Sequence, residues 1–409
     1  MIQNNDPILA DMIAREAIRQ DTEIELIASE NYVSKDVLEA NGSILTNKYA
    51  EWYAGKRYYG GCHIIDEIET LAIDRAKELF GAEHVNVQPL SGSPANMAVY
   101  LWLLQPGDTV LWFALDQWGH LTHGHPMNFS WILYKNVPYF LDRETEEMNM
   151  DELEEIAMEC KPKMLIAGFS AYSRNLDWKR FREIADKCWA ILMADIAHIA
   201  WLIAAGVIEN PVPLCDVVTT TTHKTLRGPR GGMIMCKKKY AKAIDRAVFP
   251  GMQGWPHENL IAAKAVAFWE ALKPEFKDYQ IQVIKNAQTI STSLQEKGFK
   301  IVSGGTDNHL MLVDTFKSFG VTGKDAEHAL EVVGLSVNKN MVPYDTRPPM
   351  NPSGIRIGTP AATTRGMGIE EMKEIADIFS EAIQNHNNAA HLEIQRQRVL
   401  MLCEKFPIY

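Results

Sequence analysis

The chain has 409 residues, 46% hydrophobic and 23% charged, so it is long enough to bury a sizeable core and to form two or three domains. Its formal net charge of −11, without a long basic block, argues against nucleic acid as a partner. The six cysteines form no CxxC pair and show no metal-site spacing, as is typical of proteins kept in the reducing cytoplasm.

The N-terminal segment lacks the basic, apolar and small-residue order of a signal peptide. One apolar stretch, residues 189–208, has the length of a membrane span, but Asp195 and His198 lie at its centre. A central Asp disfavours insertion by roughly 2.5–3.5 kcal/mol. We therefore expect a buried strand followed by a turn here, no membrane association and a cytoplasmic location.

The predicted elements begin with an amphipathic helix over residues 6–20, which we interpret as an arm that packs on a partner. A helical segment is expected around residues 37–45, and the aromatic, glycine-punctuated stretch 47–62 is predicted to be a loop. Helices and apolar strands then alternate, which predicts an α/β fold with a mostly parallel sheet between helices. The expected helices are 64–80, 91–104, 178–187 and 257–272, and the expected strands are 84–88, 109–113, 164–167, 190–195 and a pair around Lys224.

The rhythm of the sequence changes near Pro274. A helix over residues 278–297, strands at 300–303 and 309–314, a helix over 323–333 and C-terminal helices predict a second, smaller α/β domain. The predicted division is an N-terminal arm (1–25), a large cofactor-binding domain (26–273) and a small C-terminal domain (274–409).

The segment QPLSGSPAN (88–96) is typical of a strand end, a tight turn and a helix start, with Pro94 at the first helical position. Free backbone N–H groups and the hydroxyls of Ser91 and Ser93 around Gly92 would form a cup for phosphate. A capped helix without any ligand is the alternative.

Two further side chains stand at predicted strand ends. Asp195 follows the apolar run ILMA, and a buried carboxylate needs a cation or N–H partner, which a pyridinium nitrogen or a local Arg would supply. Lys224 follows the β-branched run 217–222 and precedes the loop RGPRGG. A lysine emerging into a crowded pocket is partly desolvated, which favours the nucleophilic amine that forms Schiff bases. The alternative is an ordinary surface lysine.

The second predicted domain contains Arg356 within the apolar strand of SGIRIGTPA (353–361), where a guanidinium could hold a carboxylate through two hydrogen bonds. A structural ion pair is the alternative. The run GHLTHGH (119–125) would allow a metal site through His120, His123 and His125, but no suitably spaced carboxylate or Cys accompanies it. We expect no metal, and a stacking role for His120 on an aromatic cofactor.

Phosphate cup, Asp, Lys and Arg occur in the order found in pyridoxal-phosphate enzymes of the aspartate-aminotransferase fold (fold type I). The strings LIASENYVS, GKRYYGG, GHLTHG, DIAHIA, VVTTTTHKTLRGPRGGMI, SGGTDNHL and SGIRIGTPA closely resemble the serine hydroxymethyltransferase family over essentially the whole chain. The resemblance implies reversible transfer of the serine hydroxymethyl group to tetrahydrofolate, giving glycine and methylenetetrahydrofolate. It also implies pyridoxal 5'-phosphate as cofactor and a homodimer with a shared active site, possibly within a tetramer.

The resemblance also assigns roles to individual residues. Lys224 would carry the cofactor as a Schiff base, Asp195 would pair with the ring nitrogen, and His120 would stack on the ring. Glu51 would act as acid and base at the substrate hydroxyl, with Tyr49 and Tyr59 nearby from the partner chain. The remaining assignments are Ser91, Gly92, Ser93 and the neighbouring subunit's Gly254 to the phosphate, Ser170, His198, His223 and Thr221 to the cofactor, Ser29 and Arg356 to the substrate carboxylate, and Leu115, Gly119, Leu121 and Asn340 to folate.

The tryptophans depart from the family pattern. Where the family has glycine or another small residue this chain has Trp52, Trp112, Trp118, Trp131, Trp189, Trp201 and Trp255, and Trp102 and Trp269 are also unusual. Glycine often serves where φ is positive or the backbone meets a ligand, and an indole suits neither need. Three outcomes stay open: an intact transferase, a folate-independent aldolase acting on β-hydroxy amino acids, or a catalytically impaired paralogue.

Overall fold

The computed structural model describes residues 2–409, which form two compact units. The larger unit comprises residues Val33–Ile281, and the smaller one comprises the described residues up to Tyr32 together with Gln282–Tyr409. Within the described residues, no helix is both long and apolar enough to cross a membrane.

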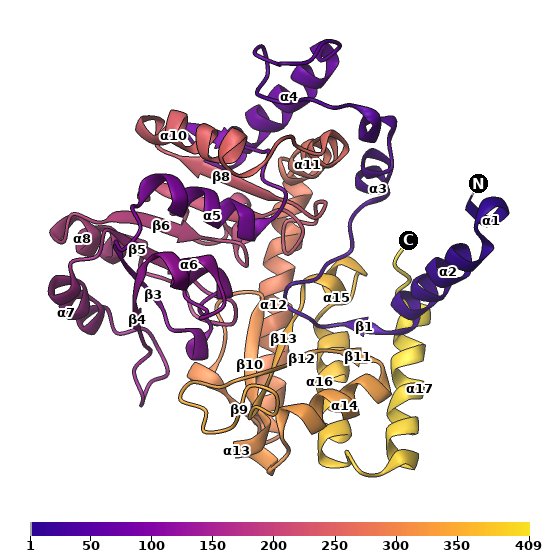
Figure 1. Cartoon of the computed structure of the whole chain (residues 1–409). Helices are drawn as coiled ribbons and strands as arrows, with labels where there is room; N and C mark the ends of the chain where they lie inside the picture. Colours follow the sequence, from indigo (N-terminus) through magenta and orange to yellow (C-terminus); the bar gives the residue numbers. More distant parts are fainter. Residues whose placement is uncertain (1) are drawn as a thin grey trace. The chain divides into compact units, whose positions relative to one another are not determined.

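A seven-stranded sheet forms the centre of the larger unit, in the order β2-β8-β7-β6-β5-β3-β4 (Figure 1). The five strands from β4 to β7 are parallel to their neighbours, whereas β8 pairs antiparallel with β7 and β2. The strands are β2 (His84–Asn86), β3 (Thr109–Phe113), β4 (Lys135–Tyr139), β5 (Met164–Gly168), β6 (Ile191–Asp195), β7 (Val217–Thr221) and β8 (Gly232–Cys236). The predicted mostly parallel α/β sheet is confirmed.

Helices flank this sheet, with α5 packed against β7 and β8 and α8 against β5 and β6. The apolar strands β5, β7 and β8 are buried along their whole length, as expected of strands covered by helices. The helices are α3 (Lys35–Asn41), α4 (His63–Phe80), α5 (Gly92–Leu103), α6 (Phe129–Leu133), α7 (Met150–Cys160), α8 (Trp178–Lys187), α9 (Ala200–Ala204), α10 (Ala241–Arg246) and α11 (Glu258–Ala271).

Three local predictions for this unit were wrong or incomplete. Helix α5 begins at Gly92 with Ser91 as N-cap, so Pro94 occupies the third helical position, where its missing N–H is equally harmless. The stretch after β6 continues into the short helix α9 instead of a turn alone. The helix α7 was not predicted, and neither was the strand β4, since KNVPY (135–139) contains a Pro and only two strongly apolar residues.

The smaller unit is built on an antiparallel sheet in the order β12-β13-β10-β9 and a two-stranded parallel sheet of β1 and β11. Its strands are β1 (Ile24–Glu25), β9 (Lys300–Ile301), β10 (Leu310–Asp314), β11 (Leu335–Ser336), β12 (Asn338–Asn340) and β13 (Gly354–Gly358). The strand predicted over 300–303 ends early, because Ser303 adopts a left-handed conformation (φ 54°) inside a 3-10 turn.

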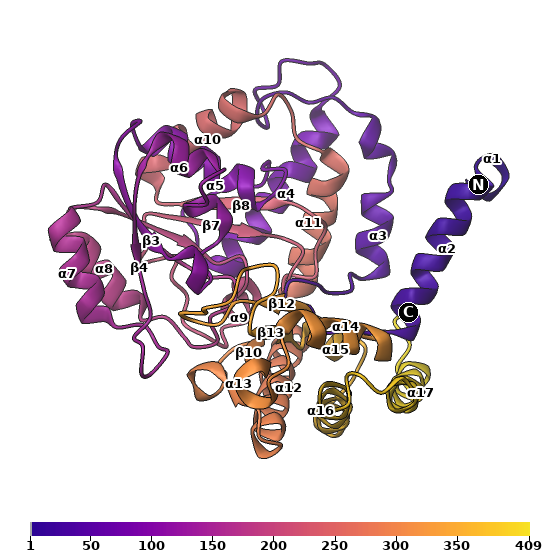
Figure 2. The same cartoon turned by 60° about the horizontal axis from the view of Figure 1, so that its bottom comes forward.

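Helices α14 (Gly323–Val333), α16 (Ile369–Gln384) and α17 (Ala389–Lys405) bury one continuous apolar core in this unit. Figure 2 views α16 and α17 nearly end-on and side by side. Helix α12 (Pro274–Glu296) contains the boundary between the units, and α13 (Thr315–Phe319) and α15 (Pro360–Thr364) are short. The N-terminal helices α1 (Ile2–Asn5) and α2 (Pro7–Thr22) bury no residue, and the arm's packing on a partner stays a prediction.

Candidate active site

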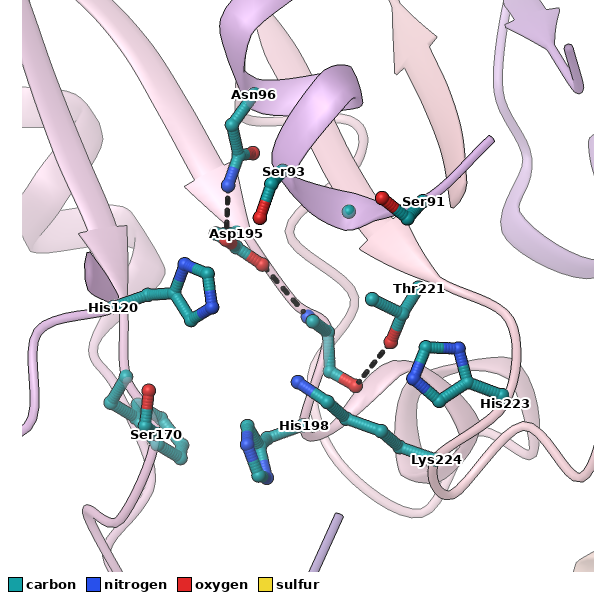
Figure 3. A pocket seen from close by; sticks show the side chains of 13 residues that line it. Ser91, Ser93, Asn96, His120, Ser170, Asp195, His198, Thr221, His223 and Lys224 are labelled. Carbon is teal, nitrogen blue, oxygen red and sulfur yellow. Dashed lines mark hydrogen bonds between the residues drawn. The ribbon is translucent and has the colours of Figure 1, made fainter. Parts of the chain in front are cut away.

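A cavity of about 200 Å³ lies where the carboxyl ends of β5, β6 and β7 meet the N-terminus of α5 (Figure 3). This edge of a parallel sheet is where α/β proteins usually bind their ligands. The cavity is lined by Ser91, Gly92, Ser93, Asn96, His120, Phe169, Ser170, Asp195, Ala197, His198, Thr221, His223 and Lys224. All residues that the sequence analysis assigned to the cofactor are therefore brought together, except Gly254.

One wall of the cavity is the start of α5. Ser91 is its N-cap in extended conformation, so the first N–H groups of the helix have no partner within the helix and carry its positive dipole end. A Cβ at Gly92 would lie 2.7 Å from Thr221 Cγ2, closer than side chains tolerate. Glycine therefore lets the turn approach β7, and the resulting cup suits an anion.

Asp195 ends β6 and is held by three neighbours. Its Oδ1 accepts from the Ala197 N–H (3.1 Å), and its Oδ2 accepts from Asn96 Nδ2 (2.9 Å) and lies 3.1 Å from His123 Nε2. Burial alone would raise the pKa of Asp195, but the bonds from His123 and Asn96 and the neighbouring imidazole of His120 outweigh it and hold the pKa well below its usual value. The carboxylate is therefore charged.

Asn96 and His123 are the site residues that the sequence reasoning missed in this role. Asn96 also accepts from Thr219 Oγ1 at 2.6 Å, which fixes its amide toward Asp195. Its position one helical turn beyond the Ser-Gly-Ser cup was the available signal, since residues four apart share a helix face. His123 is oriented from its other side by Tyr100 Oη, 2.9 Å from Nδ1.

His120, His123 and Asp195 have ligand atoms within 4.8 Å of one another, so the fold places beside two of the histidines a carboxylate that the sequence spacing did not reveal. His125 does not belong to this group, unlike the histidine set considered from sequence. The bonds of Asp195 to Asn96 and His123 already explain the arrangement.

Two histidines at the cavity are kept neutral by burial. Burial lowers the pKa of His120 to about 4, against the attraction of Asp195, and His120 Nδ1 lies 2.8 Å from Thr122 Oγ1. Burial also lowers the pKa of His223 to about 3, together with the charges of Arg230 and Lys224. A neutral imidazole presents a flat face against which an aromatic ring can stack.

Lys224 lies three residues beyond the end of β7 and is 9% exposed. Figure 3 shows its side chain extending into the cavity, toward the side on which Asp195 and His120 lie. The following loop is tied down, since Gly228 N–H donates to Thr222 O (2.8 Å) and Thr222 Oγ1 donates to Pro229 O (2.7 Å). A primary amine is thus presented from a fixed backbone.

The other residues of the larger unit that were assigned to substrate, folate or phosphate lie outside this cavity. Tyr49 Oη donates to Glu51 (2.9 Å), and the Tyr49 ring contacts those of Tyr59 and Trp255 at 4.9 and 4.7 Å between centroids. The assigned residues that lie outside the cavity are Tyr49, Glu51, Tyr59, Leu115, Gly119, Leu121 and Gly254.

Ser29, Asn340 and Arg356 belong to the smaller unit. Arg356 is half-buried on β13, and its Nε donates to Asn338 Oδ1 at 3.0 Å. Burial lowers the pKa of Arg356 to about 10, so the guanidinium remains charged at neutral pH. It can therefore attract a carboxylate.

The lining residues fit pyridoxal phosphate. The start of α5 offers donors to a phosphate, the charged Asp195 offers an acceptor to a ring N–H, and Lys224 offers an amine to an aldehyde. The neutral His120 adds a flat surface beside them.

A comparison with known protein families leads to the same group. The family model of serine hydroxymethyltransferase matches residues 2–379, nearly the whole chain. This family comprises pyridoxal-phosphate-dependent transferases that use a folate as co-substrate. The chain belongs to the serine hydroxymethyltransferase family.

Proposed function

We propose that this protein reversibly transfers the hydroxymethyl group of serine to tetrahydrofolate, giving glycine and 5,10-methylenetetrahydrofolate. The observation that carries the proposal is one cavity lined by a helix-start anion cup, a charged Asp195 and the amine of Lys224. Family membership supports the same reaction class. Because its six cysteines are all free thiols, as suits a reducing compartment, we propose that it acts in the cytoplasm.

Pyridoxal phosphate, when bound, supplies an aromatic ring that accepts the electrons of a breaking bond at the α-carbon of an amino acid. Ser91, Gly92 and Ser93 would hold its phosphate, and His120 would stack on its ring. Asp195 would keep the ring nitrogen protonated, since its own low pKa makes it a permanent negative charge. Lys224 would attach the cofactor covalently, with Ser170, His198, Thr221 and His223 around it.

The substrate carboxylate would be bound by Arg356 and Ser29. Glu51 would move the proton of the substrate hydroxyl, because a carboxylate of suitable pKa can act both as acid and as base. Since Glu51 and the adjacent Tyr49 and Tyr59 lie outside the cavity of their own chain, we propose that they serve a second copy in a homodimer. Gly254 would likewise approach the neighbouring phosphate.

Absorption spectroscopy and activity together test this function. Protein titrated with pyridoxal phosphate should acquire the visible band of a lysine Schiff base, and serine cleavage should depend on tetrahydrofolate. A protein that binds no cofactor would contradict the proposal.

The folate-independent aldolase is distinguished by the same assay. Leu115 and Leu121, assigned to folate, have exposed side chains, whereas the Trp118 side chain between them in sequence is only 5% exposed. The indole is therefore turned inward and leaves these folate contacts accessible, which favours the transferase. Serine cleavage at a rate indifferent to folate would establish the aldolase instead.

A further inference from the structure

A fully buried lysine lies behind the start of α5 and outside the cavity. Lys264, on α11, is 2% exposed and its ammonium donates to three carbonyl groups: Val87 O (2.6 Å), Gly232 O (2.9 Å) and Pro89 O (3.2 Å). Burial lowers the pKa of Lys264 to about 7, while the charges of Glu69 and Glu258 raise it. Burying an amine in this way is unfavourable unless its donors are all used, as they are here.

Two of these carbonyl groups, those of Val87 and Pro89, belong to the turn that enters the cup, and the third, that of Gly232, begins the adjacent strand β8. Two further polar groups of this turn are held by Gln253, whose Nε2 donates to Gln88 O (3.0 Å) and whose Oε1 accepts from Leu90 N–H (3.1 Å). Pro89 O also accepts from the Gly232 N–H at 3.0 Å. Four consecutive residues before Ser91 are thus fixed by side chains from elsewhere in the fold.

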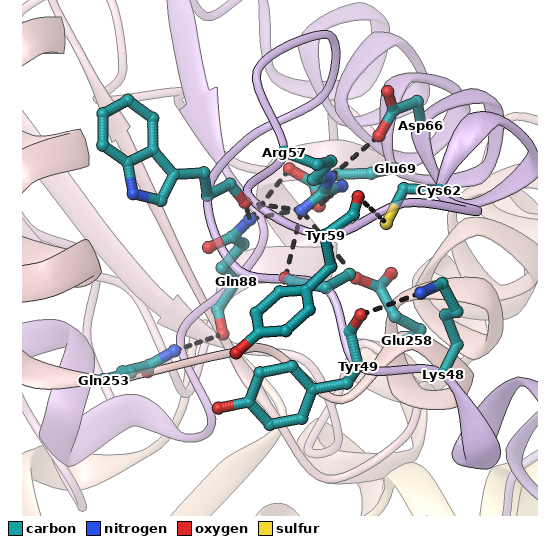
Figure 4. A network of polar contacts seen from close by, with 12 residues as sticks. Lys48, Tyr49, Arg57, Tyr59, Cys62, Asp66, Glu69, Gln88, Gln253 and Glu258 are labelled. Carbon is teal, nitrogen blue, oxygen red and sulfur yellow. Dashed lines mark hydrogen bonds and ion pairs between the residues drawn. The ribbon is translucent and has the colours of Figure 1, made fainter.

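A network of polar side chains around Gln88 also anchors the 87–90 turn (Figure 4). Gln88 Nε2 donates to Glu69 Oε1 (3.0 Å), and Arg57 pairs with the buried Glu69 at 2.7 Å. Close packing adds to this, since a Cβ at Gly232 would lie 2.3 Å from Ser91 O. A shift of the turn by a few tenths of an ångström would therefore disturb several contacts at once.

We propose that Lys264 is a positioning residue for cofactor binding, which fixes the 87–90 turn so that Ser91, Gly92 and Ser93 present their donors to the phosphate. Lys264 does not line the cavity and so acts through the turn alone. This inference rests on the proposed function, because it assumes that the cup binds the phosphate of pyridoxal phosphate.

Phosphate selectivity tests the role. Lys264→Met keeps the length of the side chain and removes its donors. We expect its affinity for pyridoxal phosphate to fall on the order of 10- to 100-fold, as when outer-shell partners of other bound groups are lost. Affinity for pyridoxal, which lacks the phosphate, should stay near that of the original chain, because Lys224 and Asp195 are untouched.

Controls separate positioning from a structural effect. Lys242→Met, at an exposed lysine, should alter neither affinity. Gln253→Ala loosens the same turn without removing a buried charge, so it should show the same phosphate-selective loss even if Lys264→Met does not fold. Equal losses for both ligands in Gln253→Ala and any folded Lys264→Met, or no loss, would overturn the role. An original chain that does not prefer the phosphorylated ligand would instead overturn the proposed function.

An independent observation concerns the tryptophans. Among residues 2–409, eight residues other than glycine have positive φ, and three of them are Trp52 (φ 73°), Trp118 (φ 78°) and Trp189 (φ 60°). Tryptophan contributes only ten of the 409 residues, so this share is far above its frequency. Bulky side chains rarely adopt this conformation, which glycine adopts freely.

Two of these residues also stand at chain positions that are typical of glycine, just after the end of a helix or turn. Trp189 directly follows Cys188, the C-cap of α8, at the position where helices commonly have a left-handed glycine. Its side chain is 90% exposed. Trp118 is the left-handed cap of a 3-10 turn at Leu115–Gln117, followed by the tightly packed Gly119. Elsewhere, the buried Nε1 atoms of Trp112 and Trp201 have no hydrogen-bond partner among the described residues, although buried indoles usually find one.

We infer that the protein made in its source cell carries glycine at positions 52, 118 and 189, because the codon translated here as tryptophan is read there as glycine. A single difference in how one codon is read then explains why tryptophan recurs at three left-handed positions.

Peptide mass spectrometry of the chain purified from its source tests this inference. Peptides spanning positions 52, 118 and 189 should each be lighter than the tryptophan mass by the difference between the two residues. The gene should use one shared codon at the three positions. Peptides with tryptophan masses at these positions would overturn the inference, and recombinant protein with tryptophan provides the reference.

Discussion

Residues 87–93 and the tryptophans at positions 52, 118 and 189 show two opposite relations between side chain and backbone. In the first region Lys264, Gln253 and the backbone around Gly92 all satisfy the same turn. In the second region the backbone is left-handed and its side chains are the bulkiest available. Agreement at every level marks a site built for binding, whereas local conflict marks a position that lowers stability.

We expect loss of function, with little change in stability, when a side chain of the cavity that Ser91, Gly92 and Ser93 help to line is altered. Lys224→Ala removes the only amine proposed to bond the cofactor, so kcat should fall on the order of 10³-fold or more. The Schiff-base absorption band should disappear, while the melting temperature without cofactor stays similar. Lys242→Ala is the control, and a variant that keeps the band would contradict the assignment.

Asp195→Asn should have the next largest effect. The amide keeps the size of the side chain but loses the charge that stabilises a protonated ring, so kcat should fall about 10²- to 10³-fold. The variant should still bind pyridoxal phosphate through Lys224. A variant with unchanged kcat would show that the Asp195 charge has another purpose.

The second region predicts a gain of stability instead. Trp118→Gly and Trp189→Gly relieve a left-handed conformation that costs about 1–2 kcal/mol per residue, so the free energy of unfolding should rise by roughly that amount, less the packing lost at the buried Trp118. Trp189, almost fully exposed, gives the cleaner result in urea unfolding.

Trp269→Gly is the matched control, because Trp269 is also exposed but lies inside the helix α11. Glycine there should lower the free energy of unfolding by about 0.5–1 kcal/mol. A rise in the free energy of unfolding for Trp189→Gly and a fall for Trp269→Gly would support the assigned strain, and changes of the same sign would contradict it.

A smaller effect is expected from pH. His223 has an ordinary pKa of 6.5 when unfolded and about 3 when folded, so only the unfolded state gains a proton as the pH falls below 6.5. The stability associated with the neutral His223 is fully present above pH 6.5, and the free energy of unfolding falls progressively from there down to about pH 3. At pH 5.5 the loss amounts to about 1 kcal/mol. His223→Asn should flatten this slope in melting curves, and an unchanged slope would contradict the assignment.

Much of the fold was readable from local patterns. The limits of α8, α14 and β3 match the prediction because amphipathic periodicity and β-branched runs are local properties. The strand β4 escaped detection because its neighbours in the sheet, not its own residues, make it a strand.

Local sequence patterns were enough to recognise the chemical groups: a Ser-Gly-Ser turn, an Asp and a Lys each at the end of an apolar run, and the family to which these strings belong. The side chains that support these groups became known only from the folded chain. Asn96, His123 and Lys264 reach their partners across 99, 72 and up to 177 residues of chain, distances over which no sequence pattern carries information. The conformation of the three tryptophans was likewise decided by the fold, because φ is imposed there by the surrounding chain against the preference of the residue.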